Sequence, residues 1–177
     1  MSKINALKQI TNMPGVDSSG ITLVASQATT SGTAWDFTGI PSWVKRITIM
    51  LNGFSTNGTS PPQVQIGNGS IANTGYSNSN SIVSSAVATA NFTTGFGIGV
   101  VATSGWSAAM TISGEMTLKL QDTNIWECKG MFGASNIAAI YLTAGSKTLG
   151  GALDRVRLTT VNGTDAGDAG SVSISYE

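Results

Sequence analysis

The sequence has few charged side chains and no histidine. Charged residues make up 10% of its 177 residues, against about 25% in an ordinary soluble domain. Nine Lys and Arg side chains balance nine Asp and Glu, so there is no excess of positive charge for the phosphates of nucleic acid. Without histidine and with one cysteine, zinc sites and Ser-His-Asp or Cys-His catalysis are excluded. We therefore expect no metal, no cofactor, no nucleic-acid partner and no enzymatic activity.

Long apolar runs are also missing from the sequence. No stretch approaches the ~20 residues of a membrane-spanning helix, and residues 1–10 do not resemble a secretory signal. We therefore expect no membrane insertion. The single cysteine, Cys128, fits synthesis in a reducing compartment and is interpreted as a small buried apolar residue.

The polarity that remains comes from Ser, Thr, Asn and Gly, which favour strands and turns over helices. Alternation predicts half-buried strands at residues 115–121, where Met116, Leu118 and Leu120 share a face, and at residues 171–177. Many short strands separated by turn signals predict an all-β fold, an antiparallel β-sandwich or jelly-roll-like domain. Further strands are expected at residues 21–26, 33–37, 44–51, 63–66, 96–102, 109–112, 125–131, 137–143 and 153–161.

The first nineteen residues differ from the β-rich domain, which we assign to residues 20–177. Ile4, Leu7 and Ile10 are spaced three apart and form one stripe of a short helix. Isolated helices of this length are marginal in water, so a frayed tail is one interpretation. The other, which we favour, is an N-terminal anchor over residues 1–19 that orders against a partner or against copies of itself.

Residues 67–94 contain few large apolar side chains and are predicted to form a long surface loop, with a short strand at residues 82–87. An aromatic ring with an adjacent hydrogen-bond donor suits the face of a sugar. We therefore expect Trp106, at a turn, and Tyr76 to be exposed platforms, with Asn78 and Asn80 as further receptor or glycan contacts. Of the other tryptophans, Trp35 and Trp126 are expected in the core or an interface and Trp43 is expected to cap the core.

Glycines occupy alternate positions at residues 96–100, so one face of that predicted strand is nearly bare. A bare face predicts the close approach of another segment or another chain.

Two arginines, Arg155 and Arg157, share one face of the predicted strand at residues 153–161. They could form inter-subunit salt bridges, because charges retained at interfaces set register and specificity. They could equally be matched inside the sheet by Asp154, Glu127 or Glu115. The sequence leaves both interpretations open.

Two groups of acidic residues are candidates for chemical sites. Asp165 and Asp168 could supply oxygen ligands to Ca²⁺, but they lack the spacing of an EF-hand, and an Asx-rich turn is favoured. Sugar hydrolysis needs two carboxylates at a set separation, which the sequence cannot place. The candidates for such a pair are Glu115, Asp122, Glu127 and Asp154.

Residues 36–50 read DFTGIPSWVKRITIM and continue in a related pattern to residue 67. Residues 149–165 read LGGALDRVRLTTVNGTD and are followed by AGSVSISYE at residues 169–177. In this order, the two motifs resemble a recurrent C-terminal domain of tailed-bacteriophage tail fibre proteins over residues 28–177. The resemblance implies a β-rich domain of the virion, at the distal end of a fibre and assembled as a homotrimer. It carries over no catalytic residues.

The composition and the resemblance together predict a virion structural protein, made in the cytoplasm of the host bacterium. We expect a tail fibre tip that contributes to host attachment through many weak contacts with surface polysaccharide. Ile4, Leu7 and Ile10 would then attach the tip to other virion proteins. The alternative is a capsid or tail decoration protein that stabilises the particle, and a less favoured one is a polysaccharide depolymerase.

Overall fold

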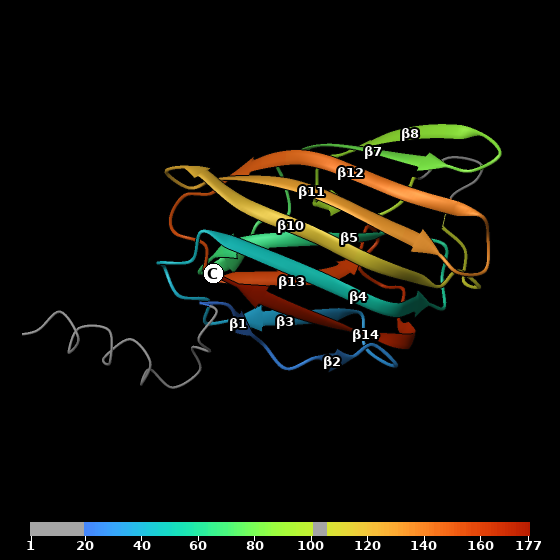
Figure 1. Cartoon of the computed structure of the whole chain (residues 1–177), viewed down its shortest axis with the longest axis horizontal. Helices are drawn as coiled ribbons and strands as arrows, with labels where there is room; N and C mark the ends of the chain where they lie inside the picture. Colours follow the sequence, from blue (N-terminus) through green and yellow to red (C-terminus); the bar gives the residue numbers. More distant parts are fainter. Residues whose placement is uncertain (1–19, 101–105) are drawn as a thin grey trace, which may run out of the picture.

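The computed structural model describes residues 20–100 and 106–177, which form two antiparallel β-sheets packed face to face (Figure 1). The predicted all-β sandwich is therefore confirmed. The proposed anchor, with Ile4, Leu7 and Ile10, lies outside the described residues. Within the described ranges, no helix has the length and apolar character needed to cross a membrane.

The larger sheet has nine strands, and each of its ladders is antiparallel. The strand β2 (Gln27–Ala28) lies off the main path and pairs with the C-terminal strand. The main path runs β1 (Thr22–Leu23), β14 (Gly167–Tyr176), β4 (Arg46–Thr56), β10 (Ile112–Asp122), β11 (Ile125–Ala134), β12 (Ala139–Thr148), β7 (Ser77–Val83) and β8 (Val87–Phe92).

The smaller sheet has five strands, with β13 between two partners and the short β9 paired to β5. The chain passes repeatedly between the two sheets, so each sheet combines segments that are far apart in the sequence. The path of the smaller sheet is β3 (Ala34–Thr38), β13 (Arg155–Thr160), β5 (Pro62–Asn68) and β6 (Ser70–Ile71), and β9 is Phe96–Gly97.

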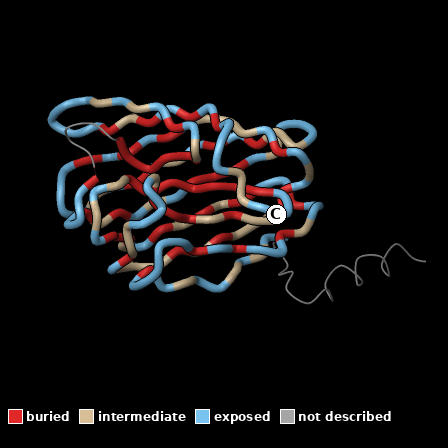
Figure 2. Tube along the Cα trace, turned by 180° about the vertical axis from the view of Figure 1, so that it is seen from behind, coloured by how far each residue is buried: buried red, intermediate tan, exposed pale blue. Residues whose placement is uncertain are grey.

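The core lies between the sheets because inward positions recur every second residue along a strand. In β10 the alternation buries Met116 and Leu118, and in β14 it buries Val172 and Ile174. The buried stretches follow the middle of the strands, and exposed stretches mark the turns (Figure 2). The alternation predicted for residues 171–177 is therefore confirmed by pairing and by burial, and that for residues 115–121 is confirmed except at Thr117, which is buried on the other face.

The prediction of a long loop over residues 67–94 is wrong, because this stretch contains β6, β7 and β8. The sequence of β7 is SNSNSIV, in which exposed serines alternate with buried asparagines. This is a period of two, but amide groups stand where apolar side chains would mark the inner face. A pattern search based on hydrophobicity therefore misses the strand.

The glycine-rich stretch after residue 95 packs closely, as its bare face predicts, but the neighbour is the same chain. A Cβ atom added to Gly97 would clash with the Asn80 amide and would lie 2.7 Å from the ring of Phe92. The expected contact with another chain is not needed to explain this glycine.

Candidate functional site

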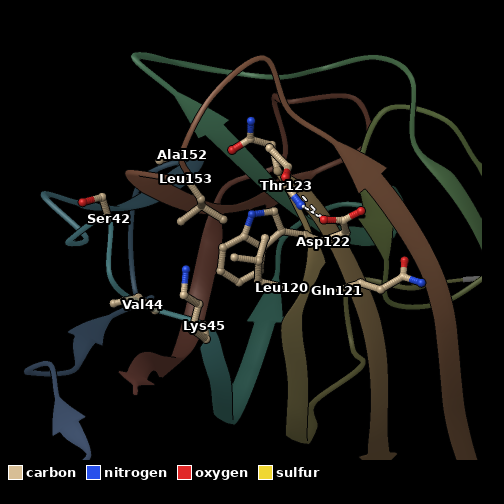
Figure 3. Close-up of a pocket in the computed structure, with 11 residues that line it drawn as sticks. Ser42, Val44, Lys45, Leu120, Gln121, Asp122, Thr123, Ala152 and Leu153 are labelled. Atoms are coloured by element: carbon tan, nitrogen blue, oxygen red, sulfur yellow. Dashed lines mark hydrogen bonds between the residues drawn. The ribbon is translucent and has the colours of Figure 1, made fainter.

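A cleft of about 470 Å³ lies at the end of the sandwich where β4 and β11 begin and β10 ends (Figure 3). Three segments meet there: the loop before β4, the β10–β11 turn and the loop before β13. Its apolar lining comes from Val44, Leu120, Trp126, Ala152 and Leu153, and its polar lining comes from Ser42, Lys45, Gln121, Asp122, Thr123 and Asn124.

The β10–β11 turn is tight, with Asp122 and Ile125 paired across two intervening residues. The backbone N–H of Thr123 donates to the Asp122 carboxylate at 2.6 Å. Asn124 has a φ of 59°, a left-handed conformation that asparagine tolerates better than most residues. Its carbonyl accepts the backbone N–H of Leu149 at 2.9 Å, which joins the turn to the loop before β13.

The indole of Trp126 contributes to the cleft lining although the residue is only 2% exposed. Its Nε1–H is buried and has no hydrogen-bond partner among the described residues. An unpaired buried donor costs about 1–3 kcal/mol. Because the atom is covered, an acceptor oxygen reaches it only after neighbouring side chains shift. The expectation that Trp126 belongs to the core is confirmed.

The exposed tryptophan of the described chain is Trp43, with 52% of its surface accessible. It stands in the loop before β4, between the cleft residues Ser42 and Val44. Its ring contacts that of Tyr176 edge-on, with ring centroids 5.9 Å apart. The prediction that Trp43 caps the core is therefore wrong, since more than half of the residue's surface is accessible.

The lining of the cleft suits binding by contact and hydrogen bonding. Its titratable side chains are one amine, on Lys45, and one carboxylate, on Asp122, within the part of the chain that the structure describes. Hydrolysis of a sugar linkage commonly needs a second carboxylate. Hydroxyl, amide and apolar groups around a hollow are instead typical of a site that holds a neutral polar ligand.

Arg155 and Arg157 each form an ion pair within the chain. Arg157 Nε and Nη2 donate to the two Asp36 oxygens, both at 2.7 Å, across the β13–β3 ladder. Arg155 Nε donates to Asp154 at 2.7 Å, and the guanidinium holds the pKa of that carboxyl below its usual range. Asp154 also accepts the backbone N–H of Gly69 at 3.1 Å. The sequence analysis named Asp154 as a partner for these arginines, but it did not name Asp36. A salt bridge between either arginine and another subunit stays a prediction.

The expected aromatic platforms are both buried, so the prediction of exposed rings at Tyr76 and Trp106 is wrong. The Tyr76 hydroxyl donates to Ala72 O at 2.9 Å and accepts the backbone N–H of Ile66 at 2.8 Å. Burial raises the pKa of this phenol above its ordinary value. Trp106 packs against Phe54 and donates its Nε1–H to Thr56 Oγ1 at 2.8 Å. Neither ring face is available to a receptor.

Asn78 and Asn80, expected as receptor contacts, form a buried polar network between the two sheets. Asn80 Nδ2 donates to Gly99 O at 3.0 Å, and the backbone N–H of Gly97 donates to Asn78 Oδ1 at 2.9 Å. Thr143 lies between the two amides, donating to Asn80 Oδ1 and accepting from Asn78 Nδ2, both at 2.9 Å. The prediction of surface contacts at these residues is wrong because their hydrogen bonds are used inside the protein.

Asp165 belongs to the turn before β14, and Asp168 lies in β14 itself. Asn162 Oδ1 accepts the backbone N–H groups of Thr164 and Asp165, and the Asp165 carboxylate accepts the backbone N–H of Ser60 at 2.8 Å. These contacts match the Asx-rich turn that the sequence favours. No group of three or more His, Cys, Asp or Glu residues suited to a metal occurs within residues 20–100 and 106–177.

Sequence reasoning missed the cleft because its lining comes from three separate segments. One local signal for the site was available in the sequence. In the motif at residues 36–50, Trp43 lies between a polar residue and the start of a strand. Comparisons of the chain with protein-family models, with curated proteins and with solved structures gave no match.

Proposed function

We propose that this chain is a structural protein of a tailed-bacteriophage particle, and that it forms a homotrimeric tail fibre tip that contributes to host attachment. The two motifs of the resemblance support the proposal because they are neighbours in space. Asp36 from the first motif pairs with Arg157 from the second, and the loops before β4 and β13 both line the cleft.

The observation that carries the proposal is the exposed indole of Trp43 beside a cleft lined by hydroxyl and amide groups. An indole offers an apolar face to the C–H groups of a sugar ring, and neighbouring polar groups can bind its hydroxyls. The site has no excess of charge, so the ligand that we assign to it is a neutral stretch of host polysaccharide. Three copies of such a site gain avidity even when each one binds weakly.

Electron microscopy of the phage that encodes this chain tests its place in the particle. Gold-labelled antibodies against the protein should mark the fibre tips. Label distributed over the capsid would support a decoration protein instead. Particles without any label would contradict both assignments.

Binding to polysaccharide from the bacterium on which that phage grows tests the site. We expect Trp43→Ala to weaken binding about tenfold, equivalent to about 1.4 kcal/mol. Ile137→Ala is the matched control, because Ile137 is also an exposed apolar residue but lies in the β11–β12 turn. Equal binding by wild type and Trp43→Ala would reject the site. Shortening of the polysaccharide during incubation would show depolymerase activity.

A further inference from the structure

The open edges of the two sheets differ in how they are protected. A strand edge presents unpaired N–H and C=O groups, and natural proteins blunt such edges with short strands, charges, proline or covering segments. The edge strands β1 and β6 are two residues long. The edge strand β3 carries Asp36, whose backbone carbonyl accepts Gln27 Nε2–H at 2.8 Å.

Among the described residues, the remaining edge, β8, has none of these protections. It is six residues long, with the sequence VATANF, and contains neither charge nor proline. No charged residue occurs between Arg46 and Glu115, so the whole β7–β8 hairpin is uncharged. The hairpin forms the outermost part of the larger sheet, at the top of Figure 1.

An exposed apolar patch adjoins this edge on the outer face of the sheet. Val87 of β8 is 69% exposed and pairs with Val83, which in turn pairs with Ile140. Leu142 and Met131 extend the patch across the next two strands. The patch and the bare edge are thus one continuous uncharged surface, of the kind that marks a protein interface.

We propose that β8 pairs antiparallel with β8 of a second copy of the chain, fusing two nine-stranded sheets. The partner must offer an open strand of similar length without charge, and among the described edges only β8 does so. A two-fold axis at Thr89 sets Val87 of each copy opposite Asn91 of the other, so no like charges meet. The pairing also places the two apolar patches on the same face of the fused sheet. The β8 pairing is a separate interface from the one that forms the proposed homotrimer, and the two together give six chains.

Light scattering at micromolar concentration tests the interface with Thr89→Lys and its control Thr148→Lys. Thr148 is exposed at the far end of β12, away from the β8 edge. We expect the wild type to contain six 18.1 kDa chains, two of the proposed trimers joined through β8. Three chains would leave the proposed trimer standing and reject the β8 pairing. Thr89→Lys should halve the mass, because two lysines would face each other across the axis, and Thr148→Lys should leave it unchanged. A monomeric or odd-numbered wild type, or an unchanged Thr89→Lys mass, would overturn the proposal.

Mixing Thr89→Lys with Thr89→Glu should restore the wild-type mass, because opposite charges then face each other. Failure of the mixture to assemble would count against a two-fold axis at this residue. If Thr89→Lys does not fold, Thr89→Cys treated with a short bismaleimide provides a second test. Cys128 is buried, so the introduced thiol is the reactive one. A covalent dimer is expected, and its absence would overturn the proposal.

Discussion

Replacing Asn80 with alanine tests whether the buried amides hold the two sheets together. Asn80 lies on β7 of the larger sheet and is 1% exposed. It donates to Gly99 O, which follows β9 of the smaller sheet, and accepts the hydroxyl of Thr143 on β12. The substitution leaves the Gly99 carbonyl and the Thr143 hydroxyl without these partners in a buried site.

The expected loss follows from these two hydrogen bonds. Together they contribute about 2 kcal/mol, and the partners left unsatisfied in the interior raise the loss toward about 4 kcal/mol. We therefore expect Asn80→Ala to lower the free energy of unfolding by about 2–4 kcal/mol. For a domain of this size, that corresponds to a melting temperature lower by about 5–15 °C.

Urea unfolding followed by tryptophan fluorescence measures this change, with Asn73→Ala as the control. Asn73 is exposed, so its replacement should alter the free energy of unfolding by no more than about 0.5 kcal/mol. Combining Asn80→Ala with Thr143→Val should cost less than the sum of the single changes, because both remove the same hydrogen bond. A loss below about 1 kcal/mol for Asn80→Ala would refute the bridging role.

Three further outcomes are expected. Gly97→Ala should lower the free energy of unfolding by about 1–3 kcal/mol, because its Cβ would meet the Asn80 amide and the Phe92 ring. Thermal unfolding measures this change, and an unchanged stability would contradict the packing. Cys128 should react with a thiol reagent only after denaturation, because burial raises the pKa of the thiol; rapid reaction of the folded protein would show an accessible cysteine. The Asp154 pKa lies below its usual value, so its contribution to stability is present above about pH 4 and lost on acidification. Asp154→Asn should therefore unfold less steeply with falling pH than wild type, and identical acid titrations would contradict the role of Arg155.

The strands that could be predicted from the sequence are those in which large apolar residues mark the inner face. In β10 and β14 the alternation of apolar and polar residues coincides with the alternation of inner and outer faces. In β7 the inner positions hold Asn78 and Asn80, whose amides are satisfied by other strands and by the glycine-rich segment. No local pattern reveals those partners, because they lie 19 to 66 residues away.

The candidate site shows the same limit. The sequence predicts an exposed Trp106 at a turn and a Trp43 that caps the core, and the structure has the opposite exposures. Trp106 is buried because Phe54 and Thr56 of β4 lie against it. Trp43 stands in the loop before β4 beside the ring of Tyr176, and 52% of its surface is accessible. Exposure of an aromatic ring is thus decided by the packing of distant strands.

The low charge of the chain fits both candidate binding surfaces, since the β8 edge carries no charge and the cleft carries one amine and one carboxylate. The cleft lies beside β10 and β11, and the β8 edge is separated from them by β12 and β7. Pairing through β8 would therefore leave the cleft and Trp43 of each copy free, so assembly would multiply the attachment sites without covering any of them. Charge at the β8 edge would hinder the pairing of two strands, which bind each other through backbone groups. Charge in the cleft is not required, because sugars bind through neutral groups. A surface of hydroxyls, amides and apolar side chains is compatible with both.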